Sequence, residues 1–275
     1  MKKILLPTDF SANAQTALNA ALSTAKKFDS DLYILNTYNI NVGHYGFFDQ
    51  LEDKVKDASK NEMTKLKESV LASGFPEDKL HLFSEHGILT DIVKKMNKQF
   101  DFDLLIMGTK GASGVEEVLI GSRTADVVSS IQVPVLVVPE NSTNFNFDVI
   151  TYAADFKYIK SKRLLSPLNA FAKAFNSNIN FLRVTKPTDD ELTLNKDFDE
   201  MGVKYSEWFG KQEHSFHYET NDQVEEGINN FSVKSNTNLL CVLARKNGLI
   251  RFLFHKSVSK KLTYHTKMPL LIIQE

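Results

Sequence analysis

Short hydrophobic runs alternate along the chain with longer stretches in which apolar residues recur at helical spacing. In the first half, the apolar runs predict strands over Lys3–Leu6, Asp31–Leu35, Lys79–Ser84, Leu104–Met107 and Val133–Val138. The periodic stretches predict helices after Ser11 and over Asp49–Ser73, Thr90–Phe100 and Ala125–Ile131. Because strands separated by helices form parallel βαβ units, the pattern indicates a doubly wound α/β sheet.

The same pattern restarts after Pro139–Asn146, a polar, turn-rich segment that we interpret as a linker. The second set of predicted strands covers Phe147–Tyr152, Asn178–Val184, Ser215–Glu219, Leu239–Ala244 and Leu270–Ile273. Helices are predicted between them, over Leu164–Phe175, Leu194–Phe209 and Gln223–Lys234. A repeat of about 135–146 residues corresponds to whole domains rather than a solenoid. We therefore expect two tandem doubly wound parallel-sheet domains, 1–142 and 143–275.

A glycine-rich segment follows the predicted strand Leu104–Met107 and leads into a helix. Glycines let backbone N–H groups approach a phosphate, and a helix N-terminus adds unpaired donors and partial positive charge. The candidate phosphate ligands are Gly108, Lys110, Gly111, Gly121, Ser122, Arg123 and Thr124. An ordinary tight turn remains the alternative. The segment lacks the GK[ST] ending of a P-loop and the GxGxxG of a dinucleotide fold.

Asp9 lies just past the first predicted strand, as Gly108 lies just past the fourth. In a doubly wound sheet, ligands bind beyond the carboxyl ends of the strands, so the two residues are expected to face one crevice. A carboxylate there can accept hydrogen bonds from ribose hydroxyls or support a metal ion. The alternative is that Asp9 caps the following helix or stabilises a turn.

Composition narrows the range of partners. The 275 residues include 42% hydrophobic and 24% charged residues, as in globular proteins. The net charge of −1 argues against general electrostatic binding to nucleic acid or an anionic membrane. No apolar run approaches the ~20 residues that span a bilayer. The single cysteine, Cys241, lies in an apolar run and is expected to be a buried thiol. These features together favour a cytoplasmic location.

Three motifs resemble the universal stress protein family. They are PTDFS after the first strand, G-x2-G-x9-G-[ST] beginning at Gly108, and VPVLVVP at the last strand of the first half. The resemblance implies five-stranded domains and binding of ATP, ADP or AMP, with Mg²⁺.

The resemblance also implies roles for individual residues. Gly108, Gly111, Gly121 and Ser122 would hold the phosphates, with Arg123 and Thr124 adding contacts at the helix start. Asp9 would face the ribose or the Mg²⁺ ion. Thr8, Thr37 and Met107 are expected near adenine and ribose, and Pro7 completes the candidate nucleotide-binding site.

The second half departs from the motif. Asp155 corresponds in position to Asp9, and Ser257 corresponds to Ser122. Lys256 replaces Gly121, and Gly248 is the only glycine that remains in the loop. We therefore interpret the second half as a degenerate site.

In the family, such domains commonly pair through their last strands. Val135–Val138 and Leu270–Ile273 are thus expected to pair within the chain as an intramolecular pseudo-dimer, and a homodimer of chains is also possible.

No catalytic constellation stands out. His214 and His217 are three residues apart, without further residues at metal-ligand spacing. The sequence favours an ATP-binding regulatory protein of the stress response that acts through an unknown protein partner, with neither nucleic acid nor membrane as partner. The alternatives are an interaction scaffold that binds no nucleotide and a slow ATPase or transferase.

Overall fold

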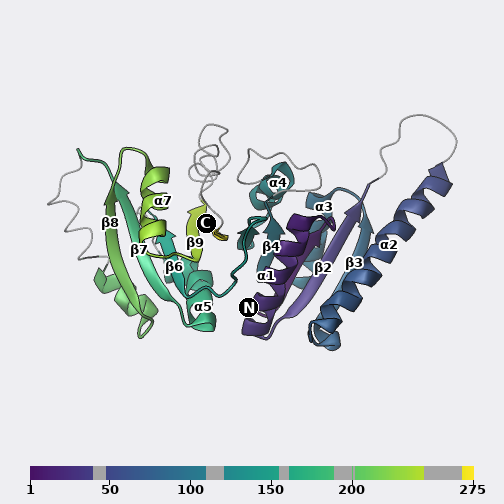
Figure 1. The fold of residues 1–275 in the computed structure, drawn as a ribbon, viewed down its shortest axis with the longest axis horizontal. Coiled ribbons are helices and arrows are strands. Elements are labelled where there is room, and N and C mark those ends of the chain that lie inside the picture. The colour runs from purple at the N-terminus through teal and green to yellow at the C-terminus, as the bar shows by residue number, and fades with distance from the viewer. Residues whose placement is uncertain (40–47, 110–120, 155–160, 189–199, 201, 245–267) are drawn as a thin grey trace.

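The computed structural model describes residues 1–39, 48–109, 121–154, 161–188, 200, 202–244 and 268–275. Its first half alternates strands and helices from the N-terminus onward (Figure 1). The elements are β1 (Lys3–Thr8), α1 (Ala12–Phe28), β2 (Asp31–Tyr38), α2 (Phe48–Ala72), η1 (Glu77–Lys79), β3 (Leu80–His86), α3 (Leu89–Phe100), β4 (Leu104–Gly108), α4 (Ser122–Ser130) and β5 (Val135–Val138).

The second half repeats this alternation. Its elements are β6 (Val149–Ala153), η3 (Lys162–Leu165), α5 (Ser166–Phe175), β7 (Asn178–Thr185), β8 (His214–Thr220), α7 (Val224–Lys234), β9 (Leu239–Ala244) and β10 (Leu270–Gln274). Residues 202–209 are helical as well. The connection over residues 139–148 contains neither helix nor strand, as predicted for the linker. The domain boundary predicted after residue 142 falls within it and stays a prediction.

The ten strands of the described residues form one sheet in the order β3-β2-β1-β4-β5-β10-β9-β6-β7-β8. Neighbouring strands are parallel within each half. The two halves meet where β5 and β10 pair antiparallel, with Leu136 opposite Leu271. The predicted α/β class, the two five-stranded parallel sets and the pairing of the last strands are therefore confirmed. A homodimer of chains stays a prediction.

Helices cover both faces of the sheet because successive strand residues point to opposite sides. On one face, Ile4 and Leu6 of β1 belong to a hydrophobic cluster with α1, α2 and α5. On the other face, Leu5 belongs to a cluster with α3, α4 and α7. Each cluster includes residues of both halves, so the core continues across the β5–β10 seam.

Aromatic packing joins the halves beside this seam. Phe28 of α1 lies edge-on against Phe171 of α5, with ring centroids 5.4 Å apart. Phe147, at the end of the linker, is fully buried and lies 4.8 Å from the ring of Phe175. Within the described part of the chain, no helix is long and apolar enough to cross a membrane.

Several element boundaries differ from the sequence predictions, and three of these changes affect residues of the candidate site. β1 continues through Pro7 to Thr8, because both residues pair with β2, and β2 continues to Tyr38, because its last residues pair with β3. α4 begins at Ser122 rather than Ala125, with Gly121 as its N-cap. These shifts place Thr37 on a strand, and Arg123 and Thr124 in the first turn of a helix.

Candidate functional site

The strands separate between β1 and β4. After β1 the chain passes to β2 on one side, and after β3 it crosses to β4 on the other, so this is the point where the strand order reverses. β1 and β4 pair only through Ile4 and Leu5, whereas β4 stays paired with β5 up to Gly108. A crevice at the carboxyl end of such a divergence is the usual ligand position in doubly wound sheets.

A pocket occupies this position and brings together residues from six elements and the turn after β1. Its lining consists of Pro7, Thr8, Asp9, Ala14, Thr37, Leu89, Met107, Gly108, Arg123 and Thr124. All but two of these were predicted from the sequence. Ala14 and Leu89 were missed because a small or apolar residue at helical spacing is indistinguishable in sequence from one that only packs in the core.

The N-terminus of α4 opens towards this pocket. Its N-cap is Gly121, and no side chain in the described residues caps it. By contrast, the Ser11 hydroxyl caps α1 by accepting a hydrogen bond from the Ala14 N–H at 3.2 Å. The first-turn donors of α4 are therefore available to an anion, with the exposed Arg123 beside them.

Two hydrogen bonds fix α4 against the end of β4. The Thr124 hydroxyl donates to the Gly108 carbonyl at 2.9 Å, and Thr124 is 4% exposed. The Gly121 N–H donates to the Thr109 carbonyl at 2.5 Å. The predicted hydroxyl ligand Thr124 thus already has a structural partner, while Ser122 in the same turn is exposed and is not part of the pocket lining.

Asp9 lines the pocket and also organises the turn after β1. Its Oδ1 accepts a hydrogen bond from the Ser11 N–H at 3.2 Å. Phe10 between them has φ of 61°, a left-handed conformation that is uncommon for non-glycine residues. The Thr8 hydroxyl accepts from the Phe10 N–H at 3.1 Å. The turn therefore holds the Asp9 carboxylate at the pocket. The turn role is present in the structure, whereas contact with ribose or a metal ion stays a prediction.

Gly108 is packed against the buried side chain of Asn13. A Cβ at position 108 would lie 2.5 Å from Asn13 Oδ1, closer than real contacts allow. Asn13 is 3% exposed, and its amide donates to the Val138 carbonyl at 3.1 Å. Gly108 is thus required for close packing at the pocket floor, and neither pattern nor spacing revealed Asn13 as its partner.

A chain of buried hydrogen bonds supports the pocket from behind. The Asn36 amide donates to the Thr8 carbonyl at 2.8 Å, and Asn36 Oδ1 accepts from the Ser59 hydroxyl at 2.7 Å. Ser59 Oγ also lies 2.6 Å from Ser84 Oγ. The end of β1 is therefore tied to β2, α2 and β3, a connection that the sequence analysis did not anticipate.

Several predicted site residues lie outside the described residues. They are Lys110 and Gly111 in the first half, and Asp155, Gly248, Lys256 and Ser257 in the second. Among the described residues, no group of three or more His, Cys, Asp or Glu side chains could hold a metal. His217 packs its ring against Phe231 at 4.8 Å. Cys241 is fully buried, and burial raises the pKa of its thiol well above the ordinary value.

Comparisons with known proteins agree on one family. A model of the universal stress protein family matches residues 1–139. A universal stress protein of Methanocaldococcus jannaschii is 29% identical, over 50% of this chain and 81% of the relative. A protein of Staphylococcus saprophyticus, named as a putative universal stress protein, is 30% identical, over 57% of this chain and 94% of the relative.

A solved structure resembles the whole chain. The crystal structure of a universal stress protein from Archaeoglobus fulgidus has a TM-score of 0.73 and covers 99% of this chain and 96% of its own. At 20% identity, this similarity shows the fold alone.

Proposed function

The chain belongs to the universal stress protein family, and from this we propose that its first half binds ATP or a related adenine nucleotide in a regulatory role. The observation that carries the proposal is the pocket itself. It joins a carboxylate, Asp9, and a guanidinium, Arg123, to an uncapped helix N-terminus at the point where the strand order reverses. This combination suits a ligand with phosphates at one end and hydroxyl groups at the other.

The phosphates would lie against the first turn of α4. Backbone donors at Ser122 and Arg123 and the positive end of the helix dipole attract anions there. The exposed Arg123 side chain can reach a phosphate as a charged donor. We propose that Lys110 and Gly111 complete the phosphate contacts, and that Gly121, whose N–H already bonds the Thr109 carbonyl, leaves room for a phosphate to approach the helix.

The nucleoside would occupy the side formed by β1 and β2. Asp9 would accept hydrogen bonds from ribose hydroxyls, and Thr8 and Thr37 supply polar groups next to it. Met107 and Leu89 give an apolar surface for the adenine ring.

Mg²⁺ would be bound jointly by the protein and the nucleotide. Mg²⁺ is commonly held by one or two carboxylates together with substrate phosphates rather than by a cage of protein groups. Asp9 is the one carboxylate in the described lining, which fits this kind of site. The ion would neutralise phosphate charge beside that carboxylate.

A regulatory role is favoured over rapid turnover by the chemistry of the lining. No histidine or cysteine lines the pocket in the described part of the chain, which leaves Asp9 as its one candidate base, and Asp9 Oδ1 already accepts a hydrogen bond from the Ser11 N–H. A hydrogen bond offers a route for a signal. Gln274 of β10 donates to the Val128 carbonyl of α4 at 2.7 Å, which joins the helix at the pocket to the second half. We place this function in the cytoplasm, with a protein partner as the receiver.

Substitution of Gly121 tests the proposal. Its φ of −61° and ψ of 157° suit any residue, and Asp and Ser are both good N-caps. Gly121→Asp and Gly121→Ser are therefore expected to fold as stably as the wild type. Only the aspartate adds a negative charge against the phosphates, and like charges in contact cost several kcal/mol. We expect Gly121→Asp to weaken Mg-ATP binding by at least about tenfold relative to Gly121→Ser.

Binding is measured by calorimetry, and nucleotide carried through purification is identified by mass spectrometry after denaturation. Equal affinities of the two variants would contradict the assignment of phosphates to α4. If the wild type bound no adenine nucleotide at all, the protein would be better described as an interaction scaffold.

A further inference from the structure

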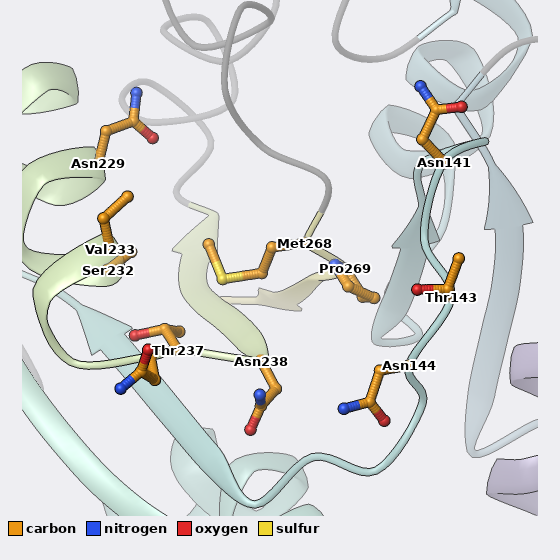
Figure 2. Close-up of a pocket in the computed structure, with 11 residues that line it drawn as sticks. Asn141, Thr143, Asn144, Asn229, Ser232, Val233, Thr237, Asn238, Met268 and Pro269 are labelled. Carbon is orange, nitrogen blue, oxygen red and sulfur yellow. The ribbon is translucent and has the colours of Figure 1, made fainter.

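A second pocket lies between the linker and α7, away from the crevice described above. One wall is formed by Asn141, Thr143 and Asn144 of the linker, and the other by α7 and the residues that follow it. Figure 2 shows Asn229 and Val233 on α7 facing the linker residues, with Met268 and Pro269 between the two walls. The linker runs here because the carboxyl end of β5 lies beside the amino end of β10.

The lining of this pocket is polar but uncharged. Five asparagines, two threonines and one serine contribute to it, with three apolar residues, and no charged side chain belongs to the described lining. Each side-chain amide offers both a donor and an acceptor, and each hydroxyl can serve as either. Sugar and polyol hydroxyl groups have the same double capacity, whereas a phosphate or carboxylate would lack a cation to pair with.

Two of these side-chain amides are held in place by a hydrogen bond at their oxygen, while their NH₂ group stays available. Asn238 Oδ1 accepts a hydrogen bond from the Val149 N–H at 2.8 Å, and Asn144 Oδ1 accepts from the Asn146 N–H at 2.9 Å. The NH₂ group of each amide has no partner among the described residues. Preorganised donors of this kind lower the cost of ordering side chains when a ligand binds.

Ser232 provides an independent sign of a missing partner. It lines the pocket, is 6% exposed, and its hydroxyl has no hydrogen-bond partner in the described structure. A buried hydroxyl without a partner is unfavourable, and such groups in native proteins call for an explanation.

The apolar residues of the lining also suit a sugar or a polyol. Val233 is 74% exposed, and Met268 lies between the two walls. Together they offer a surface for the C–H face of a ring while the asparagines reach its hydroxyl groups. The pocket encloses about 330 Å³, within the ~300–1,000 Å³ typical of small-molecule sites. We propose that this pocket binds a neutral polyhydroxylated molecule, of the size of a mono- or disaccharide.

Methionine methyl groups can test the proposal in the full chain. Met268 reports on this pocket and Met107 on the crevice between β1 and β4. With ¹³C-methyl methionine, glucose, trehalose and myo-inositol are each titrated and followed by NMR, with Met268→Leu and Met107→Leu used to assign the two signals. We expect at least one of the three to shift the Met268 signal saturably and to leave Met107 unchanged.

Matched variants decide whether the asparagines recognise the ligand. Asn229→Ala is expected to weaken binding by about tenfold, because a buried ligand hydroxyl loses its partner. Asn230→Ala, an exposed neighbour outside the lining, should leave binding unchanged. Ser232→Ala should weaken binding without destabilising the fold. Glucose 6-phosphate should bind at least about tenfold more weakly than glucose.

The proposal is overturned if none of the three compounds shifts Met268 up to about 50 mM. It is equally overturned if glucose 6-phosphate binds as well as glucose, or if Asn229→Ala binds like the wild type. Because ATP would act on Met107 and not on Met268, failure here leaves the nucleotide proposal untouched, and the reverse also holds.

Discussion

The identity of residue 108 is determined by its nearest neighbour. Asn13 fills the space where a Cβ would stand, and it cannot move without breaking its hydrogen bond to the Val138 carbonyl. Gly108 belongs to a motif that suggests phosphate binding, yet its close contact is with a protein side chain. Loss of function in a Gly108 variant would therefore say nothing about phosphate unless stability were measured as well.

We expect Gly108→Ala to lower the free energy of unfolding by about 1–3 kcal/mol, as overpacking does in well-packed cores. Gly108→Ala should cost less in an Asn13→Ala background than in the wild type, because the clash is then absent; Asn13→Ala alone is the reference, since it loses the hydrogen bond to the Val138 carbonyl. Urea denaturation measures both. Gly202→Ala is the matched control, since a Cβ there meets nothing closer than 3.9 Å and the residue lies in a helix. Equal stability of Gly108→Ala and the wild type would refute this account.

Residues of the pocket could be predicted where a motif marks them. Asp9, Gly108 and Arg123 follow strands or begin a helix, and their residue types alone suggest chemistry. Asn13 and Asn36 could not be predicted, because nothing in the sequence says which buried amide meets which carbonyl. Whether these residues bind a nucleotide stays a prediction.

At the scale of the element, the position at which helix α4 begins depends on the residues that precede it in the chain. Apolar periodicity begins at Ala125, but the helix begins at Ser122. Its start is fixed by the Gly121 N–H, which donates to the Thr109 carbonyl, and by the Thr124 hydroxyl, which donates to the Gly108 carbonyl. The polar first turn carries no apolar signal, so sequence periodicity missed it. The glycine-rich motif, and not the periodicity, had marked these residues as candidate ligands at the start of the helix, and they form its open N-terminus at the pocket.

Strand β8 and helix α7 contain a pH-sensitive contact. His217 packs against Phe231, its Nε2 lies 2.7 Å from Ser215 Oγ, and desolvation lowers its pKa below the ordinary 6.5. Glu219 and Lys234, an ion pair between the same two elements, are the nearby charges that the structure pairs. The unfolded chain therefore binds a proton more tightly at His217 than the folded chain does.

The direction in which pH changes the stability follows from the linkage between proton binding and folding. The contribution of neutral His217 is fully present above pH ~6.5 and is lost as the pH falls through the lowered pKa of the folded state. We expect the wild type to lose more stability than His217→Gln between about pH 8 and about pH 5. Unfolding free energies from urea titrations at both pH values measure this. Identical losses would mean that other groups carry the pH dependence.

For the whole molecule, the question is whether the halves unfold together. The β5–β10 pairing and the two shared hydrophobic clusters predict that they do. Trp208, the only tryptophan, lies in the second half, half-buried against Tyr205. Its fluorescence therefore reports on the second half alone, while circular dichroism reports on both.

Ile34→Ala removes a fully buried side chain from β2 in the first half and should cost about 2–5 kcal/mol. We expect the Trp208 transition in urea to shift with the circular dichroism transition, although the two sites are far apart in the sheet order. Val203→Ala, at a residue 75% exposed near Trp208, should shift neither. An unmoved Trp208 transition in Ile34→Ala would show two independent domains.

The architecture could be predicted at this scale because strand and helix periods repeat in the two halves. The pocket between the linker and α7 could not, because its walls come from residues about 90 positions apart that meet only through the antiparallel seam. Pairing across the seam was expected from family resemblance, and no local pattern around Val135 or Leu270 specifies its register.

The seam between β5 and β10 has a further consequence for how the molecule can vary. If the two halves were separate chains that paired through these strands, the fraction of paired chains would depend on their concentration. A linker of this length holds the two strands at an effective concentration on the order of millimolar, so dilution does not separate them. In a symmetric pair of chains, every substitution also appears twice. Here each half can change alone, so one half can keep an open helix N-terminus while the other acquires a different ligand.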